Sequence, residues 1–237
     1  MTASERNGER RPGIGALAPA APLAPAFSVL GVSFVEDAAA PTLRFALEAS
    51  EASGREVFTI ALTAQINIDP ARRGYDDATR ARLVELFGEP ARWAATTHSF
   101  LWAHTSTLVP SFTGTTTFSL PLACTYDLEL AAVKYFYSLP DGHAPLSFHF
   151  SGSVLHRAED GGIQVAAIPW STTARWRMPV ATWRQMIERH YPNSSWIRVH
   201  PDTAELLRGY KARAGMLSID ATVAALLEAA GRPGTGG

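Results

Sequence analysis

The architecture of this chain is set by residues 54–69, GREVFTIALTAQINID, in which apolar residues recur at every second position. This spacing is the side-chain period of a β-strand, whose two faces alternate along the chain. The preceding run TLRFALEAS, residues 42–50, alternates in the same way, and Gly54 offers the backbone freedom that a tight turn needs. The two runs therefore predict an antiparallel hairpin. One face of its second strand would carry Phe58, Ile60, Leu62, Ala64, Ile66 and Ile68, and the other Val57, Thr59, Ala61 and Thr63.

Other strand-like runs lie on both sides of this hairpin, and a single helix interrupts them. The helix is predicted over residues 76–90, DDATRARLVELFGEP, where Asp76 or Asp77 is suited to cap its first turn. Short strands joined by tight turns predict the α+β class, mainly β, with an antiparallel β-sandwich-like domain and one inserted helix. The other runs are residues 27–36, 99–109, 115–122 and 125–157, the last predicted as two long strands around the Pro-Asp-Gly turn at residues 140–142, and two short pieces at residues 162–170 and 174–178.

The period of the apolar residues changes after residue 178, from that of strands to that of helices. Alanine and proline dominate the start of the chain, which is typical of a flexible segment. We therefore expect four parts. They are an Ala/Pro-rich tail over residues 1–26, the sandwich-like domain over 27–178, a C-terminal helical element over 179–231 and a flexible tail over 232–237.

Composition excludes several classes of protein. The net charge of −1 over 237 residues provides no overall field for nucleic acid or anionic lipid. Cys124 is the only cysteine, which excludes an internal disulfide framework and an all-cysteine metal site within one chain. Prolines interrupt the apolar residues that follow the arginine pair at residues 10–11, so we expect a tail there and not an export signal. No apolar stretch reaches the ~18 residues of a membrane span, and a cytoplasmic location is expected.

Catalytic and cofactor-binding motifs are missing from the sequence. It contains no phosphate-binding glycine loop after a strand, no H-E-x-x-H zinc motif and no G-x-S-x-G nucleophile turn. His143, His149 and His156 could offer ligands near one turn, but no carboxylate or cysteine lies beside them at ligand spacing. We therefore expect no catalytic residue, no metal and no cofactor.

A charged loop, NIDPARRGYDD at residues 67–77, follows the strongest predicted strand. Its residues Asp69, Arg72, Arg73 and Tyr75 form a candidate binding loop for an anion or a partner carboxylate, because paired arginines suit such groups. The alternative is that Asp69 and the arginines pin the loop through internal salt bridges. We prefer the internal role, because loop charges usually satisfy each other.

The C-terminal stretch of residues 196–230 has the strand-helix-turn-helix order of ribbon-helix-helix DNA-binding proteins. Trp196 and Arg198 would point outward from its strand and form a candidate interaction surface. Four basic and four acidic residues cancel over the stretch, which disfavours DNA binding because phosphate contacts dominate affinity. Two amphipathic helices that pack on the sandwich, or on a second copy of the chain, explain the same pattern.

Several longer stretches carry a resemblance to a known family. They are PTLRFALEASEASGREVFTIALTAQINIDPARRGYDD, LFGEPARW, LVPSFTGTTTFSLPLACTYDLELAAVKYFYSLPDGHAPLSFHFSGSV and PVATWRQMIERHYPNSSWIRV. Over residues 27 to 230 the chain resembles a family of proteins of unknown function from high-GC bacteria, which are often encoded beside genes for a high-affinity nickel-iron hydrogenase. That family has no assigned catalytic residues, so the resemblance implies an accessory role and transfers no site.

These observations predict a non-enzymatic accessory or assembly protein that acts by protein–protein contact. Its partners would be hydrogenase subunits or maturation proteins, as the resemblance implies, and self-association is left open. Two alternatives remain. One is a DNA-binding regulator that uses the C-terminal stretch, and the other is a β-sandwich that binds an anion or small ligand through the loop at residues 67–77.

Overall fold

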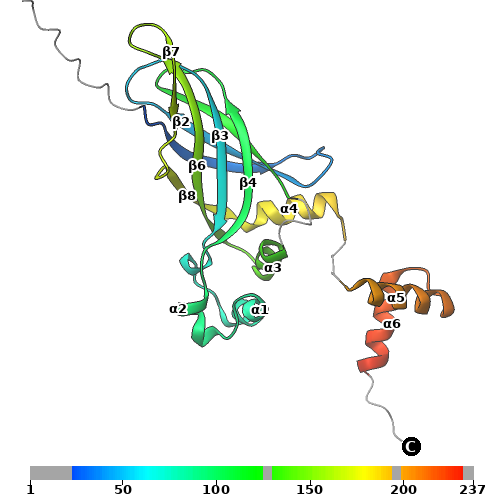
Figure 1. Ribbon diagram of the computed structural model, residues 1–237. Coiled ribbons are helices and arrows are strands. Elements are labelled where there is room, and N and C mark those ends of the chain that lie inside the picture. Colours follow the sequence, from blue (N-terminus) through cyan, green and yellow to red (C-terminus); the bar gives the residue numbers. More distant parts are fainter. Residues whose placement is uncertain (1–22, 125–129, 194–198, 232–237) are drawn as a thin grey trace, which may run out of the picture. The chain divides into compact units, whose positions relative to one another are not determined.

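The computed structural model describes residues 23–124, 130–193 and 199–231. The chain divides into two compact units, Met1–Pro192 and Asn193–Gly237, and each is described by itself. The described part of the first unit contains the strands and most of the helices, whereas that of the second contains a pair of helices (Figure 1).

Two antiparallel sheets form the first unit, which confirms the mainly β, sandwich-like class (Figure 1). The smaller sheet has the order β1-β2-β5, with β1 at Ala26–Phe34, β2 at Thr42–Ser50 and β5 at Thr115–Ala123. The larger sheet has the order β4-β3-β6-β7, and β8 pairs with the other half of the same edge of β6. Its strands are β3 at Val57–Ile68, β4 at Phe100–Val109, β6 at His143–Arg157, β7 at Ile163–Ala167 and β8 at Thr173–Pro179.

Aromatic side chains join the two sheets across the core. Phe45 of β2 is fully buried, and its ring lies 5.3 Å from that of Phe148 on β6. Trp102 of β4 and Trp176 of β8 meet the same ring edge-on, at centroid distances of 6.5 and 6.1 Å. Side chains from three strands of the larger sheet therefore meet one phenylalanine of the smaller sheet.

The predicted hairpin between residues 42–50 and 57–68 is wrong. β2 pairs with β1 and β5, whereas β3 pairs with β4 and β6, so the turn between them crosses from one sheet to the other. Buried Glu51 stabilises this turn by accepting hydrogen bonds from the backbone N–H (3.0 Å) and the hydroxyl (2.7 Å) of Ser53. Alternation predicts that each strand buries one face, but it does not say whether two strands lie side by side or face each other across the core.

The faces predicted for β3 hold along most of the strand and fail at its start. Val57 is fully buried and Phe58 is only partly buried, the reverse of the prediction. The register between β3 and β6 shifts between Val57 and Thr59, and such an irregularity turns the preceding side chain to the other face. Phe58 instead lies under the guanidinium of Arg157, 5.1 Å from its ring centre.

The strand predicted immediately before residues 140–142 is a helix, α3, at Leu130–Ser138. Its residues Ala132, Tyr135 and Phe136 are buried together with Leu139, at the i, i+3, i+4, i+7 spacing of a helix face. An ion pair joins its Lys134 to Glu85 of the neighbouring helix. So short an apolar run fits the period of a strand as well as that of a helix, which is why a strand was predicted there.

One inserted helix was expected, and the structure has a group of short helices that we call the helical cap. The predicted helix is α1, at Asp77–Phe87, capped by the Asp76 carboxylate, which accepts the Thr79 N–H at 2.6 Å. The cap lies beyond one end of the strands (Figure 1). Besides α1 and α3 it contains the 3₁₀-helices η1 (Pro70–Arg72) and η2 (Pro90–Arg92) and the short helix α2 (Trp93–Thr96).

Helix α4, Val180–His190, directly follows β8 and belongs to the first unit. Val180, Trp183 and Met186 are buried, and Trp183 stacks on Phe136 of α3 with 5.1 Å between ring centres. The division therefore falls after Pro192, whereas the sequence suggested a boundary near residue 179. Leu23 is also buried in the core, so the described chain joins the fold before residue 27.

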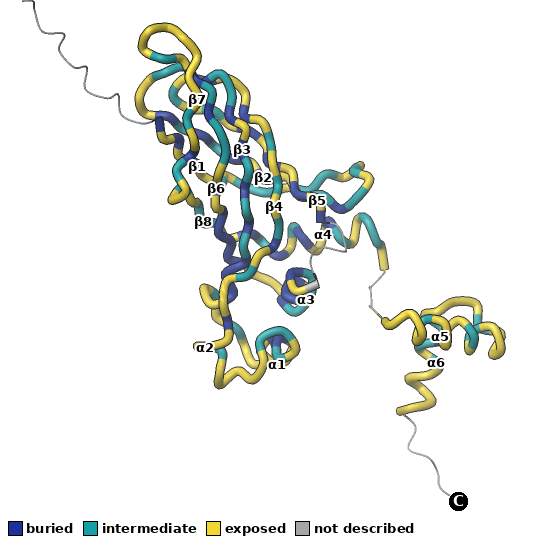
Figure 2. The backbone as a smooth tube through the Cα atoms, in the orientation of Figure 1, coloured by how far each residue is buried: buried dark blue, intermediate teal, exposed yellow. Residues whose placement is uncertain are grey.

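The second unit contains the two helices expected from the sequence, α5 at Pro201–Arg213 and α6 at Ile219–Gly231. Most of their residues are exposed (Figure 2). Leu206, Leu217 and Leu227 are 72%, 95% and 68% exposed, and Thr222 alone is fully buried among the residues described in this unit. No helix within the described ranges of either unit is long and apolar enough to cross a membrane.

Gly152 on β6 offers a test of the register between the two longest strands. Its φ is 139°, and a Cβ there would lie 2.0 Å from the carbonyl oxygen of Ala61 on β3. We expect Gly152→Ala to lower the free energy of unfolding by about 3 kcal/mol or more, because both the backbone and the neighbouring strand must move. Urea unfolding followed by circular dichroism measures the loss.

Gly54→Ala is the matched control for this substitution. Gly54 also has a positive φ, 75°, but no atom lies within 4 Å of the added methyl group. Its loss should be only about 1 kcal/mol, the cost of the left-handed backbone. Equal losses in the two variants would contradict the close approach of β6 to β3.

Candidate functional site

The charged loop at residues 67–77 connects β3 to the helical cap, and Asp69 anchors it. Asp69 donates its backbone N–H to Pro145 O at 2.9 Å. Its carboxylate is buried, accepts the Ser147 hydroxyl at 3.2 Å, and lies 3.8 Å from Nε of Arg72. Asp69 therefore joins the end of β3 to the start of β6.

Arg73 holds the loop against the turn before β6. Its guanidinium donates to the carbonyl oxygens of Asp141 and His143, both at 2.8 Å. Gly142 lies under it, and a Cβ at that glycine would come within 3.3 Å of Arg73 Nη2. These contacts occupy guanidinium donors of Arg73 within the protein.

Tyr75 is also engaged inside the protein. Its hydroxyl donates to Pro70 O at 2.8 Å and accepts the hydroxyl of buried Tyr135 at 2.9 Å. Burial raises the pKa of Tyr75, and burial together with the neighbouring Tyr75 raises the pKa of Tyr135. Both phenols therefore stay protonated at neutral pH, which suits a structural hydrogen bond and not a proton acceptor.

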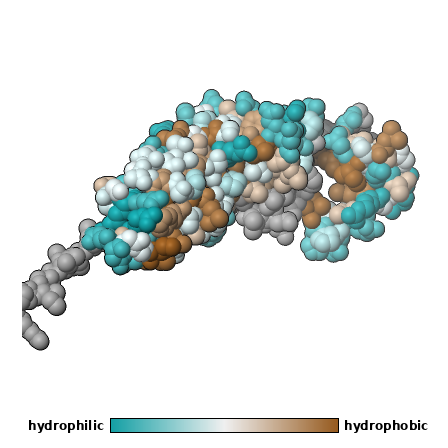
Figure 3. Space-filling view, turned by 90° about the horizontal axis from the view of Figure 1, so that it is seen from above, coloured by the Kyte–Doolittle hydropathy of each residue, from teal (hydrophilic) through white to brown (hydrophobic). Residues whose placement is uncertain are grey.

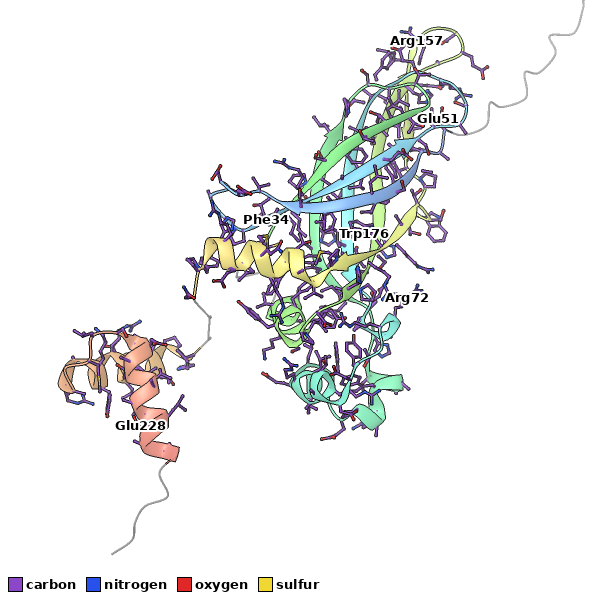
Figure 4. All side chains as sticks on the ribbon, turned by 180° about the vertical axis from the view of Figure 1, so that it is seen from behind. Phe34, Glu51, Arg72, Arg157, Trp176 and Glu228 are labelled. Carbon is purple, nitrogen blue, oxygen red and sulfur yellow. The ribbon has the colours of Figure 1, made fainter. Side chains whose placement is uncertain are left out.

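Asp69 and Arg72 line a polar pocket of about 440 Å³, which Arg73 and Tyr75 do not line. Arg72 lies where the strands meet the helical cap, at the opposite end of the sheet from Arg157 (Figure 4). We call this cavity the strand-end pocket. It is lined by Asp69, Ala71, Arg72, Thr97, His98, Ser99, Ser147, His149, Thr173 and Arg175.

Strand pairing explains why so many polar side chains meet in the strand-end pocket. On β6 and β8 the pairs are Ser147 with Arg175 and His149 with Thr173. Paired residues of antiparallel strands point to the same face. Phe148, between the two β6 residues, is buried in the core, so these four polar side chains lie on the outer face of the sheet.

Thr97, at the end of α2, closes the strand-end pocket from the side of the helical cap. It is 8% exposed, and its hydroxyl has no hydrogen-bond partner in the part of the chain that the structure describes. A buried hydroxyl without a partner costs about 1–3 kcal/mol.

The structure thus separates the four residues of the candidate binding loop. Asp69 and Arg72 line the strand-end pocket, whereas Arg73 and Tyr75 line a smaller cavity on the other side of the loop. The sequence singled out His149 only as a possible metal ligand beside His143 and His156, and the other polar residues of the pocket were missed, because they come from separate segments whose pairing the sequence does not state. An outward position on the strand predicted after the turn at residues 140–142 was a signal that could have indicated Ser147.

The other candidates from the sequence were an interaction surface in the C-terminal stretch and a histidine metal site. Trp196 and Arg198, the candidate interaction surface, lie outside the described residues. Within the described ranges, no group of three or more His, Cys, Asp or Glu side chains is arranged to hold a metal ion.

Comparisons with known proteins identify a family. Residues 23–235 match DUF6084, described as a family of unknown function. A search among curated proteins finds none that matches the chain.

Solved structures show only distant likenesses. One is the solution structure of a protein described as late embryogenesis abundant, with 12% identity and a TM-score of 0.29 over 65% of this chain and 71% of that one. Another is the crystal structure of a Bordetella pertussis protein described as ApaA, with 13% identity and a TM-score of 0.21 over 66% of this chain and 94% of that one. Likenesses this distant transfer no function to this chain.

Substitution of the adjacent arginines separates their roles. Arg73→Gln removes two hydrogen bonds to carbonyl oxygens and should lower the free energy of unfolding by about 1–2 kcal/mol. Arg72→Gln removes only a half-exposed ion pair at 3.8 Å, so it should change the free energy of unfolding by less than about 0.5 kcal/mol. Chemical denaturation of both variants measures the difference, and equal effects would contradict the assignment.

Proposed function

This chain belongs to the DUF6084 family, and we propose that it is a non-enzymatic accessory or assembly protein that acts by contact with another protein. The observation that carries the proposal is an apolar surface at the end of the larger sheet remote from the helical cap. We call it the β7 surface. It comprises Leu108, Leu155, Ile163 and Val165.

The side chains of the β7 surface share the outer face of one sheet. Val165 pairs with Leu155 across β7 and β6, while Leu108 of β4 pairs with exposed Ala61 in the next row. Leu108, Ile163 and Val165 are 71%, 72% and 65% exposed. Hydrophobic residues lie directly beside strongly hydrophilic ones toward this end of the first unit (Figure 3). A patch of exposed apolar residues with a polar rim is typical of a protein–protein interface.

The backbone of β7 provides a second feature of such an interface. β7 is the last strand in its sheet order, and no strand within the described ranges pairs with its outer edge. The Ile168 N–H bonds to Gly152 O on β6, so by alternation the backbone groups of Ile163 and Val165 point away from β6. An open edge of this kind accepts an extended segment of a partner as an additional strand.

The sequence around β7 does not place charge on this edge. Charged residues guard many exposed edge strands, but residues 161–174 contain none. Trp170, which follows β7, is 92% exposed. We infer that the partner supplies an extended apolar segment, which pairs with the backbone of β7 and covers Ile163 and Val165.

The resemblance to proteins encoded beside high-affinity nickel-iron hydrogenase genes suggests which partners to test. A hydrogenase subunit or a maturation protein comes first, in the cytoplasm that the composition favours. Delivery of a metal cluster by this chain is not part of the proposal, because its single cysteine offers one thiolate. The C-terminal helices remain a candidate DNA-binding element, which the same experiment can distinguish.

The test is recovery of partners by the tagged full-length chain at native abundance, read by mass spectrometry with and without nuclease. We expect hydrogenase subunits or maturation proteins in the wild-type sample, insensitive to nuclease. Val165→Lys places a charge on the β7 surface and should reduce their recovery by about tenfold or more, since a buried unpaired charge weakens an interface. Its unfolding midpoint should stay close to that of the wild type, because Val165 is 65% exposed.

Leu30→Lys is the matched control. Leu30 is also an exposed aliphatic residue (53% exposed), but it lies on β1 of the smaller sheet. It should leave recovery unchanged. The same recovery with Val165→Lys as with wild type would contradict a role for the β7 surface. Recovery of DNA-associated proteins alone, lost on nuclease treatment, would favour the DNA-binding alternative.

A further inference from the structure

We propose that the strand-end pocket binds a small polar molecule through an oxyanion group, either a phosphate or a carboxylate. The strand-end pocket and the β7 surface are at opposite ends of the larger sheet, so this inference does not depend on the proposed partner contact. The ligand is inferred from the charge, the hydrogen-bonding capacity and the size of the cavity.

Four nitrogen-bearing side chains in the strand-end pocket have unused donors. The side chains of Arg72, His98, His149 and Arg175 make no hydrogen bond to another residue within the described ranges, and the single ion pair among them is that of Arg72 with Asp69 at 3.8 Å. That distance exceeds a hydrogen bond, so the guanidinium donors of Arg72 remain available. Two guanidinium groups on one cavity match the geometry of phosphate and carboxylate oxygens.

Charge in the strand-end pocket favours an anion. Two arginines face one carboxylate, that of Asp69, and no other acidic residue lines the cavity. Asp69 is buried beneath the Ser147 hydroxyl, so part of its charge is already satisfied by the protein. The remaining carboxylate oxygen can accept a hydroxyl from the ligand, which would orient the oxyanion away from Asp69 and toward the arginines.

Hydroxyl groups line the rest of the cavity. Thr97, Ser99, Ser147 and Thr173 all contribute to its wall. The Thr97 hydroxyl has no partner within the described part of the chain, although the residue is 92% buried (8% exposed). The Thr97 hydroxyl oxygen is itself sealed from solvent, so the hydroxyls of Ser99 and Thr173, both exposed, are the ones that a ligand can reach.

The size of the strand-end pocket indicates more than a single inorganic ion. Its volume of about 440 Å³ falls within the range of small-molecule sites, ~300–1,000 Å³. Aromatic and large aliphatic side chains are absent from its lining, unlike in most cofactor sites. The ligand class is therefore a small hydroxylated molecule that carries a phosphate or carboxylate group.

Isothermal titration calorimetry on the full-length chain tests this inference. The probes are inorganic phosphate, glucose 6-phosphate and citrate at constant ionic strength, with glucose and sodium chloride as controls for the sugar and for nonspecific charge. We expect at least one of the three anions to bind with one site per chain, while the controls show no binding. Binding of glucose 6-phosphate without citrate identifies a phosphate ligand, and the reverse identifies a carboxylate ligand.

Arginine variants locate the binding site. Arg72→Gln and Arg175→Gln should each weaken binding by about tenfold or more, because each removes a charged donor. Arg177→Gln is the matched control: Arg177 is exposed on the same strand as Arg175, pairs with Pro145 and does not line the cavity. The affinity of this variant should stay within about threefold of the wild type, because Arg177 contributes a nearby charge but no hydrogen bond to a ligand in the cavity.

Thr97→Val is a second control, which keeps the side-chain volume and removes a hydroxyl that is sealed from solvent. It should leave the affinity unchanged and the free protein at least as stable as the wild type. Absence of binding by all three anions overturns the inference. Equal loss of affinity in Arg177→Gln overturns it as well.

Discussion

Burial of one face of every central strand against the opposite sheet is the constraint on which the rest of this structure depends. Phe45 shows it most directly, because its ring meets side chains from three strands of the larger sheet. Once Phe148 and Trp176 are turned inward, their neighbours along β6 and β8 must point outward. The composition of the outer face is therefore a consequence of how the core is packed.

That outer face is divided by chemistry along its length. Near the helical cap it carries arginine, histidine and small hydroxyl side chains, which together with η1 and Thr97 enclose the strand-end pocket. At the other end it carries the apolar side chains of the β7 surface. Packing between the two sheets requires neither composition, because outward positions do not face the core between them. This is why both regions are the natural places to look for function.

The loop at residues 67–77 shows how a local fold assigns roles to adjacent residues. Arg72 and Arg73 are neighbours with the same side chain, but the 3₁₀-helix η1 sends them to opposite sides of the loop. Arg73 donates to the carbonyl oxygens of Asp141 and His143 and therefore has a structural role. Arg72 makes a long ion pair and keeps its donors free. Only the first of these roles stabilises the protein.

The sequence by itself determined the class of the fold, the position of α1 with its Asp76 cap, the C-terminal helices, the alternation of β2 and the sets of residues that share a face along most of β3. These features depend on local periodicity and capping, which a strand or helix carries along its own length. The sequence also indicated the charged loop that contributes Asp69 and Arg72 to the strand-end pocket.

Only the tertiary structure decided which strands pair, that the turn after β2 crosses between sheets, and that Leu130–Ser138 is a helix. Pairing and register depend on contacts between residues far apart in the chain, and a short apolar run fits both periods until its neighbours select one. The strand-end pocket has the same origin. Thr97, Ser147 and Arg175 come from three separate segments, and nothing in their local sequence states that they meet.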